Sequence, residues 1–318
     1  MSKTLVEIKG LYKYFNTPKG LLHAVENVTL NINAGQTLGI VGESGCGKTT
    51  LGKVIMQLTK ATGGDVLFEG KSILGLKGSR KKESQKNIQM VFQDPYSSLN
   101  PRMNVGAIIE DPLVVLGEKM TAMQRKDKVL ELMDIVGLPE RYFNSYPHEL
   151  DGGRRQRIGI ARALALDPQF IVCDEPVSAL DVSIQAQILN LLMDLQEEKH
   201  LSYMFITHNL LVVKHISHQI AVMYMGQVVE YADKDELFSN PRHPYTQALL
   251  DAIPMPDLRV RKEKKRTLKG EVTNPINPKP GCRFAARCSL ACAACRDTDI
   301  PLREISPGHF AACVRCSD

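Results

Sequence analysis

The chain has 318 residues, of which 43% are hydrophobic and 24% are charged, with a net charge of +5 and a pI near 8.7. These values are ordinary for a globular protein, and the length predicts two or three packed units. The sequence contains no run of about 18 uninterrupted apolar residues and no signal-peptide core at its N-terminus, which excludes a membrane-spanning helix and predicts a cytoplasmic location.

Apolar runs predict a series of strands. Val28, Leu30 and Ile32 alternate with polar residues, which is typical of a half-buried strand, and Thr37–Val41 reads as a buried strand. Further strands are expected at 88–92, 170–173, 203–207 and 220–224, with a hairpin strand at 227–231. Helical patterns at 155–166 and 184–198 lie between them. Strands alternating with helices predict an α/β fold with a mostly parallel sheet covered on both faces.

Composition divides the chain further. Residues 100–150 lack strand character, so we predict an α/β core of residues 1–99 and 158–235, an inserted helical subdomain of residues 100–157, and a C-terminal extension of residues 236–318. The extension carries a mostly basic run at 259–269, which is typical of a solvated linker or, as an alternative, of a segment facing an anionic membrane. Nucleic acid is disfavoured as a partner because no aromatic residues interleave with these charges.

The segment Gly42–Thr49 fits the phosphate-loop pattern G-x-x-x-x-G-K-[ST] in full. Its glycines allow the backbone N–H groups to point inward, and the following helix adds its positive end. Lys48 is expected to reach the β- and γ-phosphates of a nucleotide, and Thr49 to ligate Mg²⁺. The predicted nucleotide contacts are Gly42, Ser44, Gly45, Cys46, Gly47, Lys48, Thr49 and Thr50, with Cys46 acting through its backbone.

Two carboxylates follow the predicted strand at 170–173. In a sheet of this type Asp174 and Glu175 lie beside the phosphate loop. We expect Asp174 to hold the Mg²⁺ shell and Glu175 to polarise the attacking water, the positioning role that phosphoryl transfer requires.

The stretch Leu150–Arg157 resembles the signature of ATP-binding cassette (ABC) proteins, whose usual form is Leu-Ser-Gly-Gly-Gln. The phosphate loop, Gln93, this signature, Asp174-Glu175, the run Ser178–Asp181 and His208 also occur in the order that this family uses. The resemblance implies a cassette fold and ATP hydrolysis. It further implies that Gln93 contacts the metal and the water, that His208 contacts the γ-phosphate, and that Phe15 stacks on the adenine, with Tyr14 as the other candidate.

The signature departs from the family pattern at Asp151, which replaces the serine, and at Arg154, which replaces the glutamine. In the family two cassettes dimerise head to tail, and the signature of one faces the nucleotide of the other. Gly152 and Gly153 retain the backbone donors, but a carboxylate cannot hydrogen-bond an unprotonated phosphate. Either Asp151 is paired off as a helix N-cap, which leaves the composite site active, or that site is degenerate. We expect the second ATPase subunit to be a paralogue.

Two further stretches, Met90–Arg102 and Asn240–Leu250, resemble the importer subfamily that handles peptides and nickel. This resemblance implies a dipeptide or oligopeptide importer ATPase at the cytoplasmic face of the membrane. Its implied partners are the second ATPase subunit, two membrane permease subunits and an extracytoplasmic binding protein. The alternatives are an importer of nickel or another small solute and, more distantly, a soluble cassette ATPase of DNA repair or translation.

Six of the eight cysteines lie after residue 280, which in a chain without an export signal indicates a metal site rather than disulfides. The pairs Cys292-x₂-Cys295 and Cys313-x₂-Cys316 have the spacing of a zinc site. The resemblance to the peptide-importer extension instead implies a structural [4Fe–4S] cluster, and we favour this set because the surrounding Gly-Cys-Arg-Phe and Pro-Gly-His residues also agree. Its ligands are Cys282, Cys288, Cys295 and Cys313.

Overall fold

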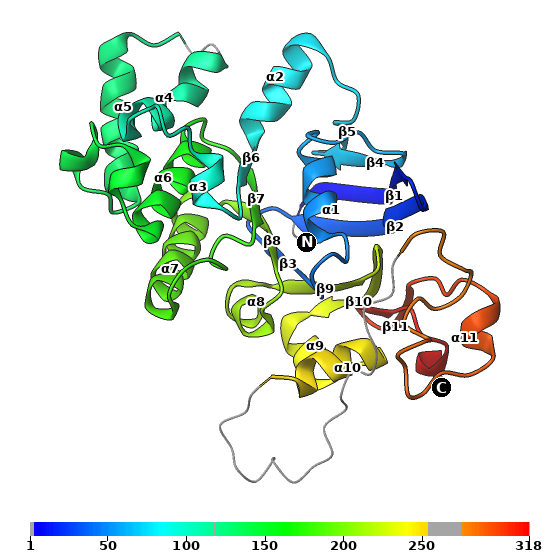
Figure 1. Ribbon diagram of the computed structural model, residues 1–318. Helices are drawn as coiled ribbons and strands as arrows, with labels where there is room; N and C mark the ends of the chain where they lie inside the picture. The colour runs from blue at the N-terminus through cyan, green and yellow to red at the C-terminus, as the bar shows by residue number, and fades with distance from the viewer. Residues whose placement is uncertain (1–2, 117–118, 254–274, 318) are drawn as a thin grey trace. The chain divides into compact units, whose positions relative to one another are not determined.

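The computed structural model describes residues 3–116, 119–253 and 275–317 (Figure 1). The chain forms two compact units, each built from separated segments. The first unit contains residues 1–6, 32–37 and 68–206, and the second contains residues 7–31, 38–67 and 207–318. The basic run at 259–269 lies outside the described residues.

The second unit carries two groups of strands. One has the order β2-β1-β4, and the other has the order β11-β12-β10-β9-β3. Strands β3 and β9 are parallel, whereas β10 pairs antiparallel with both β9 and β12, and β11 pairs antiparallel with β12. The elements of this unit are β1 (Thr4–Thr17), β2 (Gly20–Asn33), β3 (Thr37–Val41), α1 (Lys48–Ile55), β4 (Gly63–Phe68), α8 (Leu210–Ile216), β9 (Gln219–Tyr224), β10 (Gln227–Asp233), α9 (Lys234–Ser239), α10 (Pro244–Asp251), α11 (Ala294–Asp297), β11 (Arg303–Ser306), β12 (His309–Ala311) and the 3₁₀ turn η4 (Val314–Ser317).

The core of the second unit joins the strands to the C-terminal residues. Val41 of β3 and Val222 of β9 pack with Tyr224, with Tyr245 from α10 and with Phe284. The rings of Tyr224 and Tyr245 lie 4.7 Å apart between centroids, and the Phe284 ring lies 5.3 Å from each. Burying such rings together contributes the largest apolar areas that side chains provide, so residues after 280 share one core with the strands.

The first unit combines parallel strands with a group of helices. Strand β7 lies between β6 and β8 and is parallel to both, with Cys173 opposite Val91 and Phe205. Helices α4, α5 and α6 pack on one another, and α6 also contacts α3 and α7. The elements are β5 (Lys71–Ser72), α2 (Gly78–Asn87), β6 (Ile88–Val91), α3 (Pro95–Ser98), α4 (Val105–Val115), α5 (Ala122–Ile135), η1 (Glu140–Tyr142), η2 (Pro147–Glu149), α6 (Gly152–Leu164), β7 (Phe170–Asp174), α7 (Val182–Lys199) and β8 (Ser202–Thr207).

The strands expected from apolar runs are present, and the hairpin strand expected at 227–231 is β10, paired with β9. Helix α6 begins at Gly152 rather than at Arg155, because Asp151 caps it. Residues 100–150 hold helices and turns and, among the positions described there, no strand. None of the described helices combines the length and hydropathy needed to cross a bilayer.

Residues 275–317, hereafter the cysteine-rich segment, attach to the rest of the second unit along several elements. The amides of His23 and Asn277 donate to the carbonyls of Pro275 and Leu21, at 3.0 and 2.8 Å. Further along, β12 adds a strand beside β10. The segment is therefore held by backbone pairing at two separate places.

A buried ion pair adds to this attachment. Glu230 of β10 and His309 of β12 are both fully buried, and the Glu230 carboxylate lies 2.8 Å from His309 Nε2. The same carboxylate accepts the backbone N–H groups of Arg242 and His243 at 2.7 and 2.9 Å. The hydrogen bond with Glu230 raises the pKa of His309, so the pairing favours the charged imidazole.

Candidate nucleotide-binding site

The phosphate loop connects β3 to α1 within the second unit, and its glycines are required by their surroundings. Gly42 and Gly47 have φ of 154° and 106°. A Cβ at Gly42 would lie 2.2 Å from the Met223 carbonyl oxygen, and one at Gly47 would lie 2.1 Å from the Ala24 carbonyl oxygen. No side chain is tolerated at either position without moving backbone, so the loop has the tight path that lets its N–H groups converge on an anion.

Lys48 begins α1 and is buried, with only 4% of its surface exposed. Its Nζ donates to the carbonyl oxygens of Gly42 at 2.8 Å and of Glu43 at 3.0 Å. The loop thus holds the ammonium group against its own backbone, in reach of any phosphate that the loop binds. Cys46 is also buried, and burial raises the pKa of its thiol, in line with a residue that acts through its backbone.

The first unit brings Gln93 and Glu175 together. Gln93 Nε2 donates to the Glu175 carboxylate at 2.9 Å. Glu175 directly follows buried Asp174 at the end of β7, has φ of 46°, and donates its backbone N–H to Ile206 at 2.9 Å. The left-handed backbone turns the Glu175 side chain out of the strand direction, where it meets the amide of Gln93 at the end of the neighbouring strand.

The other predicted residues of the second unit lie near chain turns. His208 is exposed between β8 and α8, and the next residue, Asn209, caps α8 by accepting the N–H of Leu211 at 3.0 Å. Phe15 has 36% of its surface exposed, with the Lys13 ammonium 4.4 Å from its ring centroid.

Tyr14 differs from Phe15, because its hydroxyl donates to Glu26 at 2.7 Å and its ring lies 4.2 Å from that of His23. Phe15 is therefore the ring that remains accessible for stacking.

The signature loop lies at the N-terminus of α6 in the first unit. Asp151 caps the helix by accepting the Arg154 N–H at 2.8 Å, and its second carboxylate oxygen pairs with the Arg154 guanidinium. Both carboxylate oxygens are thus occupied by the same residue. Packing also favours glycine at position 153, since a Cβ there would lie 2.7 Å from the Ile184 side chain of α7. Asp151 is therefore paired off as a helix N-cap, as the first of the two alternatives for this residue requires.

The phosphate loop is also held by residues that the sequence patterns did not single out. Arg287 of the cysteine-rich segment makes two hydrogen bonds to the Glu43 carboxylate, at 2.6 and 3.0 Å. The Tyr245 hydroxyl accepts the Glu43 N–H at 3.0 Å, and Gly226 donates to the Cys46 carbonyl at 2.8 Å. These contacts join positions that are far apart in sequence, and no local pattern marks them.

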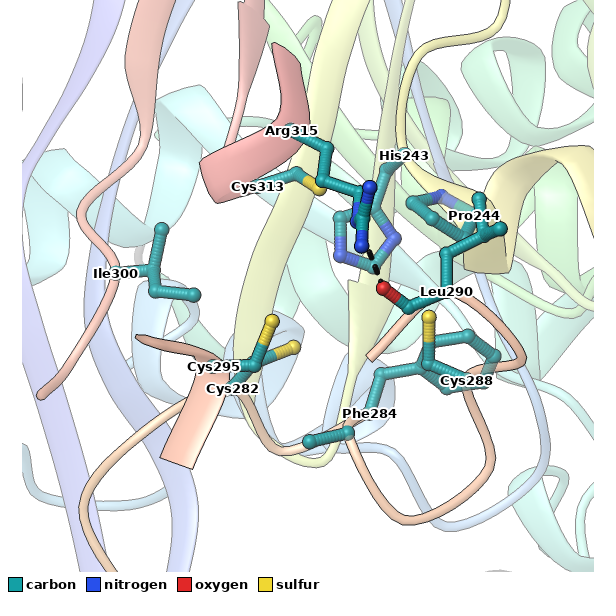
Figure 2. Close-up of a pocket in the computed structure, with 11 residues that line it drawn as sticks. His243, Pro244, Cys282, Phe284, Cys288, Leu290, Cys295, Ile300, Cys313 and Arg315 are labelled. Carbon is teal, nitrogen blue, oxygen red and sulfur yellow. Dashed lines mark hydrogen bonds between the residues drawn. The ribbon is translucent and has the colours of Figure 1, made fainter. Parts of the chain in front are cut away.

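Four of the six cysteines of the segment gather at one cavity (Figure 2). Cys282, Cys288, Cys295 and Cys313 all line it, together with apolar side chains and Arg315. Cys292 and Cys316 do not line it, although the Cys292 and Cys295 sulfurs lie 3.6 Å apart. Among the described residues, no group of three or more His, Cys, Asp or Glu side chains is arranged to hold a metal ion.

Parallel strands with a glycine-rich loop that opens a helix define a P-loop nucleotide-binding protein. Residues 25–178 match the family model described as ABC transporter, and residues 229–295 match the model described as oligopeptide/dipeptide transporter, C-terminal region. The chain is 50% identical over 314 residues to the oligopeptide transport ATP-binding protein OppF of Salmonella typhimurium, covering 98% of this chain and 94% of that protein. It is 48% identical over 320 residues to AppF of Bacillus subtilis, covering 98% and 97%. The chain therefore belongs to the ABC transporter family, among its ATP-binding proteins.

The fold is also that of solved cassettes. The chain is similar to the dimeric ATP-binding cassette MJ0796, in a post-hydrolysis state bound to ADP and phosphate, with a TM-score of 0.67 and 31% identity. The similarity covers 72% of this chain and 99% of that one. A second similar structure is cbiO1 of Clostridium perfringens, part of a transporter complex, with a TM-score of 0.66 and 25% identity over 75% and 92% of the two chains. These likenesses confirm the α/β cassette fold.

Proposed function

We propose that this chain is the ATP-hydrolysing subunit of an importer of dipeptides or oligopeptides. The observation that carries this proposal is the identity of about half of all residues, over 98% of the chain, with relatives named oligopeptide transport ATP-binding proteins. The phosphate loop, with buried Lys48 held at its centre, supplies the ATP-binding element. Nickel or another small solute is the alternative substrate of the same importer.

Each predicted site residue has a proposed role in this reaction. Backbone donors of the phosphate loop and Lys48 bind the phosphates, while Thr49, Gln93 and Asp174 complete the Mg²⁺ shell. Glu175 positions and polarises the attacking water, and its hydrogen bond with Gln93 supports this role by fixing the carboxylate. His208 contacts the γ-phosphate, and Phe15 stacks on the adenine.

The proposed assembly places a second ATPase subunit, a paralogue, opposite this one, with the signature of each chain facing the other's nucleotide. Two permease subunits and an extracytoplasmic peptide-binding protein complete the importer, with this chain at the cytoplasmic face. The similarity to a dimeric cassette supports the pairing of two ATPase subunits.

Transport by the purified assembly tests the function. The chain is expressed with its candidate partners, purified from membranes, and reconstituted in vesicles that contain ATP, with the binding protein and labelled oligopeptide supplied outside. We expect labelled oligopeptide to accumulate only when ATP is present. Uptake of nickel but not of peptide would select the alternative cargo, and failure of any permease to co-purify would contradict the importer.

The altered signature leads to a first prediction, about Asp151→Ser. Because both Asp151 oxygens are bound by Arg154, we infer that the carboxylate is neutralised and the composite site stays active. The ATP turnover of the assembled complex should therefore stay within about twofold, since a serine hydroxyl can cap the helix in place of the neutralised carboxylate. Arg154→Gln, which strips Asp151 of its cation, is the matched control and should lower turnover. A clear gain of turnover in Asp151→Ser would instead indicate a degenerate site.

We propose that Cys282, Cys288, Cys295 and Cys313 hold a structural [4Fe–4S] cluster. What supports this set is that these four thiols, from separate stretches of the segment, line one cavity with apolar walls and the cation of Arg315. The zinc set would need Cys292 and Cys316, which are outside that cavity. When bound, the cluster would cross-link the segment.

A further inference from the structure

Arg287 forms a two-pronged ion pair that links the cysteine-rich segment to the phosphate loop. Its two terminal nitrogens donate to the two oxygens of Glu43 at 2.6 and 3.0 Å. The Arg287 side chain is 6% exposed and that of Glu43 is 21% exposed, so water competes weakly for the pair. The hydrogen bond that Arg287 donates to the Glu43 carboxylate is the main cause that raises the pKa of Arg287. Bidentate, partly buried pairs between arginine and a carboxylate are among the stronger hydrogen-bonded ion pairs in proteins.

Glu43 is tied through its backbone to Lys48, the proposed phosphate-binding lysine. Its carbonyl oxygen accepts a hydrogen bond from Lys48 Nζ at 3.0 Å, and its N–H donates to the Tyr245 hydroxyl at 3.0 Å. The side chain, the carbonyl and the amide of Glu43 are thus each held by a different residue. Arg287 therefore helps to fix the residue against which Lys48 is aligned.

The charge of Glu43 gives Arg287 a second effect. Glu43 is the second residue of a loop that binds a polyanion, and its carboxylate by itself would repel the phosphates. The guanidinium of Arg287 cancels this charge. Arg287 also donates a hydrogen bond to the Tyr224 hydroxyl, at 3.4 Å.

We propose that Arg287 is a positioning residue of the nucleotide site, which neutralises Glu43 and fixes the phosphate loop for ATP. The ATP affinity of the cassette then depends on a charge that the cysteine-rich segment supplies. This inference rests on the proposed function, because it takes ATP as the ligand of the loop.

Arg287→Gln in the full chain, measured with its partners, tests the proposal. We expect the Kd and the KM for Mg-ATP to rise about tenfold, the order of effect of one uncompensated charge near a polyphosphate inside a protein. The kcat should change much less than the KM, because Arg287 touches no reacting atom. Glu43→Gln removes the carboxylate that Arg287 cancels, so the double variant Glu43→Gln/Arg287→Gln should recover most of the lost ATP affinity.

Arg283 provides the matched control. It belongs to the same segment, is similarly buried, and pairs with Glu26 instead of the loop carboxylate, at 2.9 Å. Any loss of ATP affinity in Arg283→Gln should not be recovered by Glu43→Gln.

Unchanged affinity in Arg287→Gln, or a loss that Glu43→Gln leaves in place, overturns the proposal. If Arg287→Gln does not fold, two other variants carry the same test: Arg287→Lys, which keeps the charge, and the double variant. A double variant that cannot bind ATP overturns the proposal. ATP binding by the unaltered chain is the reference, and its absence would count against the proposed function instead.

Discussion

Replacing Glu175 by glutamine should abolish steady-state ATP turnover while ATP still binds. The carboxylate at the end of β7 is held by Gln93 and is the proposed group that polarises the attacking water, whereas phosphate binding is assigned to the loop of the other unit. Loss of such a group reduces rates by about 10²–10⁴-fold. The amide of glutamine has nearly the same shape, so binding of Mg-ATP should stay within a few fold. Turnover of the assembled complex and equilibrium binding of ATP are the two measurements.

Glu198, an exposed carboxylate in the last turn of α7, serves as the control for this change. Glu198→Gln should turn over ATP at the rate of the unaltered chain. If Glu175→Gln retained more than a tenth of normal turnover, a different group would have to activate the water.

Four of the six C-terminal cysteines should be needed for bound iron. Purified without oxygen, the unaltered chain should contain about four iron and four sulfide per chain, as a [4Fe–4S] cluster requires. Substituting alanine for any one of the cysteines that line the cavity should remove most of the iron and leave the chain less stable. Metal and sulfide analysis measures the first effect and thermal unfolding the second. The four positions are Cys282, Cys288, Cys295 and Cys313.

Cys292 and Cys316 are the matched controls, since they lie in the same segment but not on the cavity. Cys292→Ala and Cys316→Ala should keep their iron. Zinc at one atom per chain without iron, lost from Cys292→Ala and Cys316→Ala but kept by Cys282→Ala, would establish the zinc set in place of the cluster.

Local patterns predicted the parts of this fold whose signal is local. The runs at Thr37–Val41 and Phe170–Asp174 are fully buried, and continuous apolar runs of that length predict strands because both faces are covered. The phosphate loop was predictable because its pattern lies within eight consecutive residues, although the carbonyl groups that require Gly42 and Gly47 belong to Met223 and Ala24, which are distant in sequence. The roles assigned to Gln93, Glu175 and His208 stay predictions, carried by the family resemblance.

Short and glycine-bearing elements escaped the same patterns. Strand β12 has only three residues, too few for any periodicity to show, and it exists because β10 offers an edge to pair with. Strand β4 begins with Gly63-Gly64, residues that weaken a strand locally, and a Cβ at Gly64 would lie 2.0 Å from the Gly10 carbonyl oxygen. Likewise, nothing near Arg287 in sequence marks Glu43 as its partner. Such contacts depend on tertiary packing.

The strand pairing of β12 with β10 bears on how the chain can be divided. The described order ends β10-β12-β11, so the outermost strand is β11, which is short and presents Arg303 and Glu304. A shortened protein that stopped after α10 would lack β12, so the edge of β10 would be unpaired. The buried Glu230 carboxylate would also lose its partner His309. Open edges of this kind recruit strands from other molecules. A recombinant chain should therefore extend at least to the end of β12, and shorter versions should be recovered as aggregates.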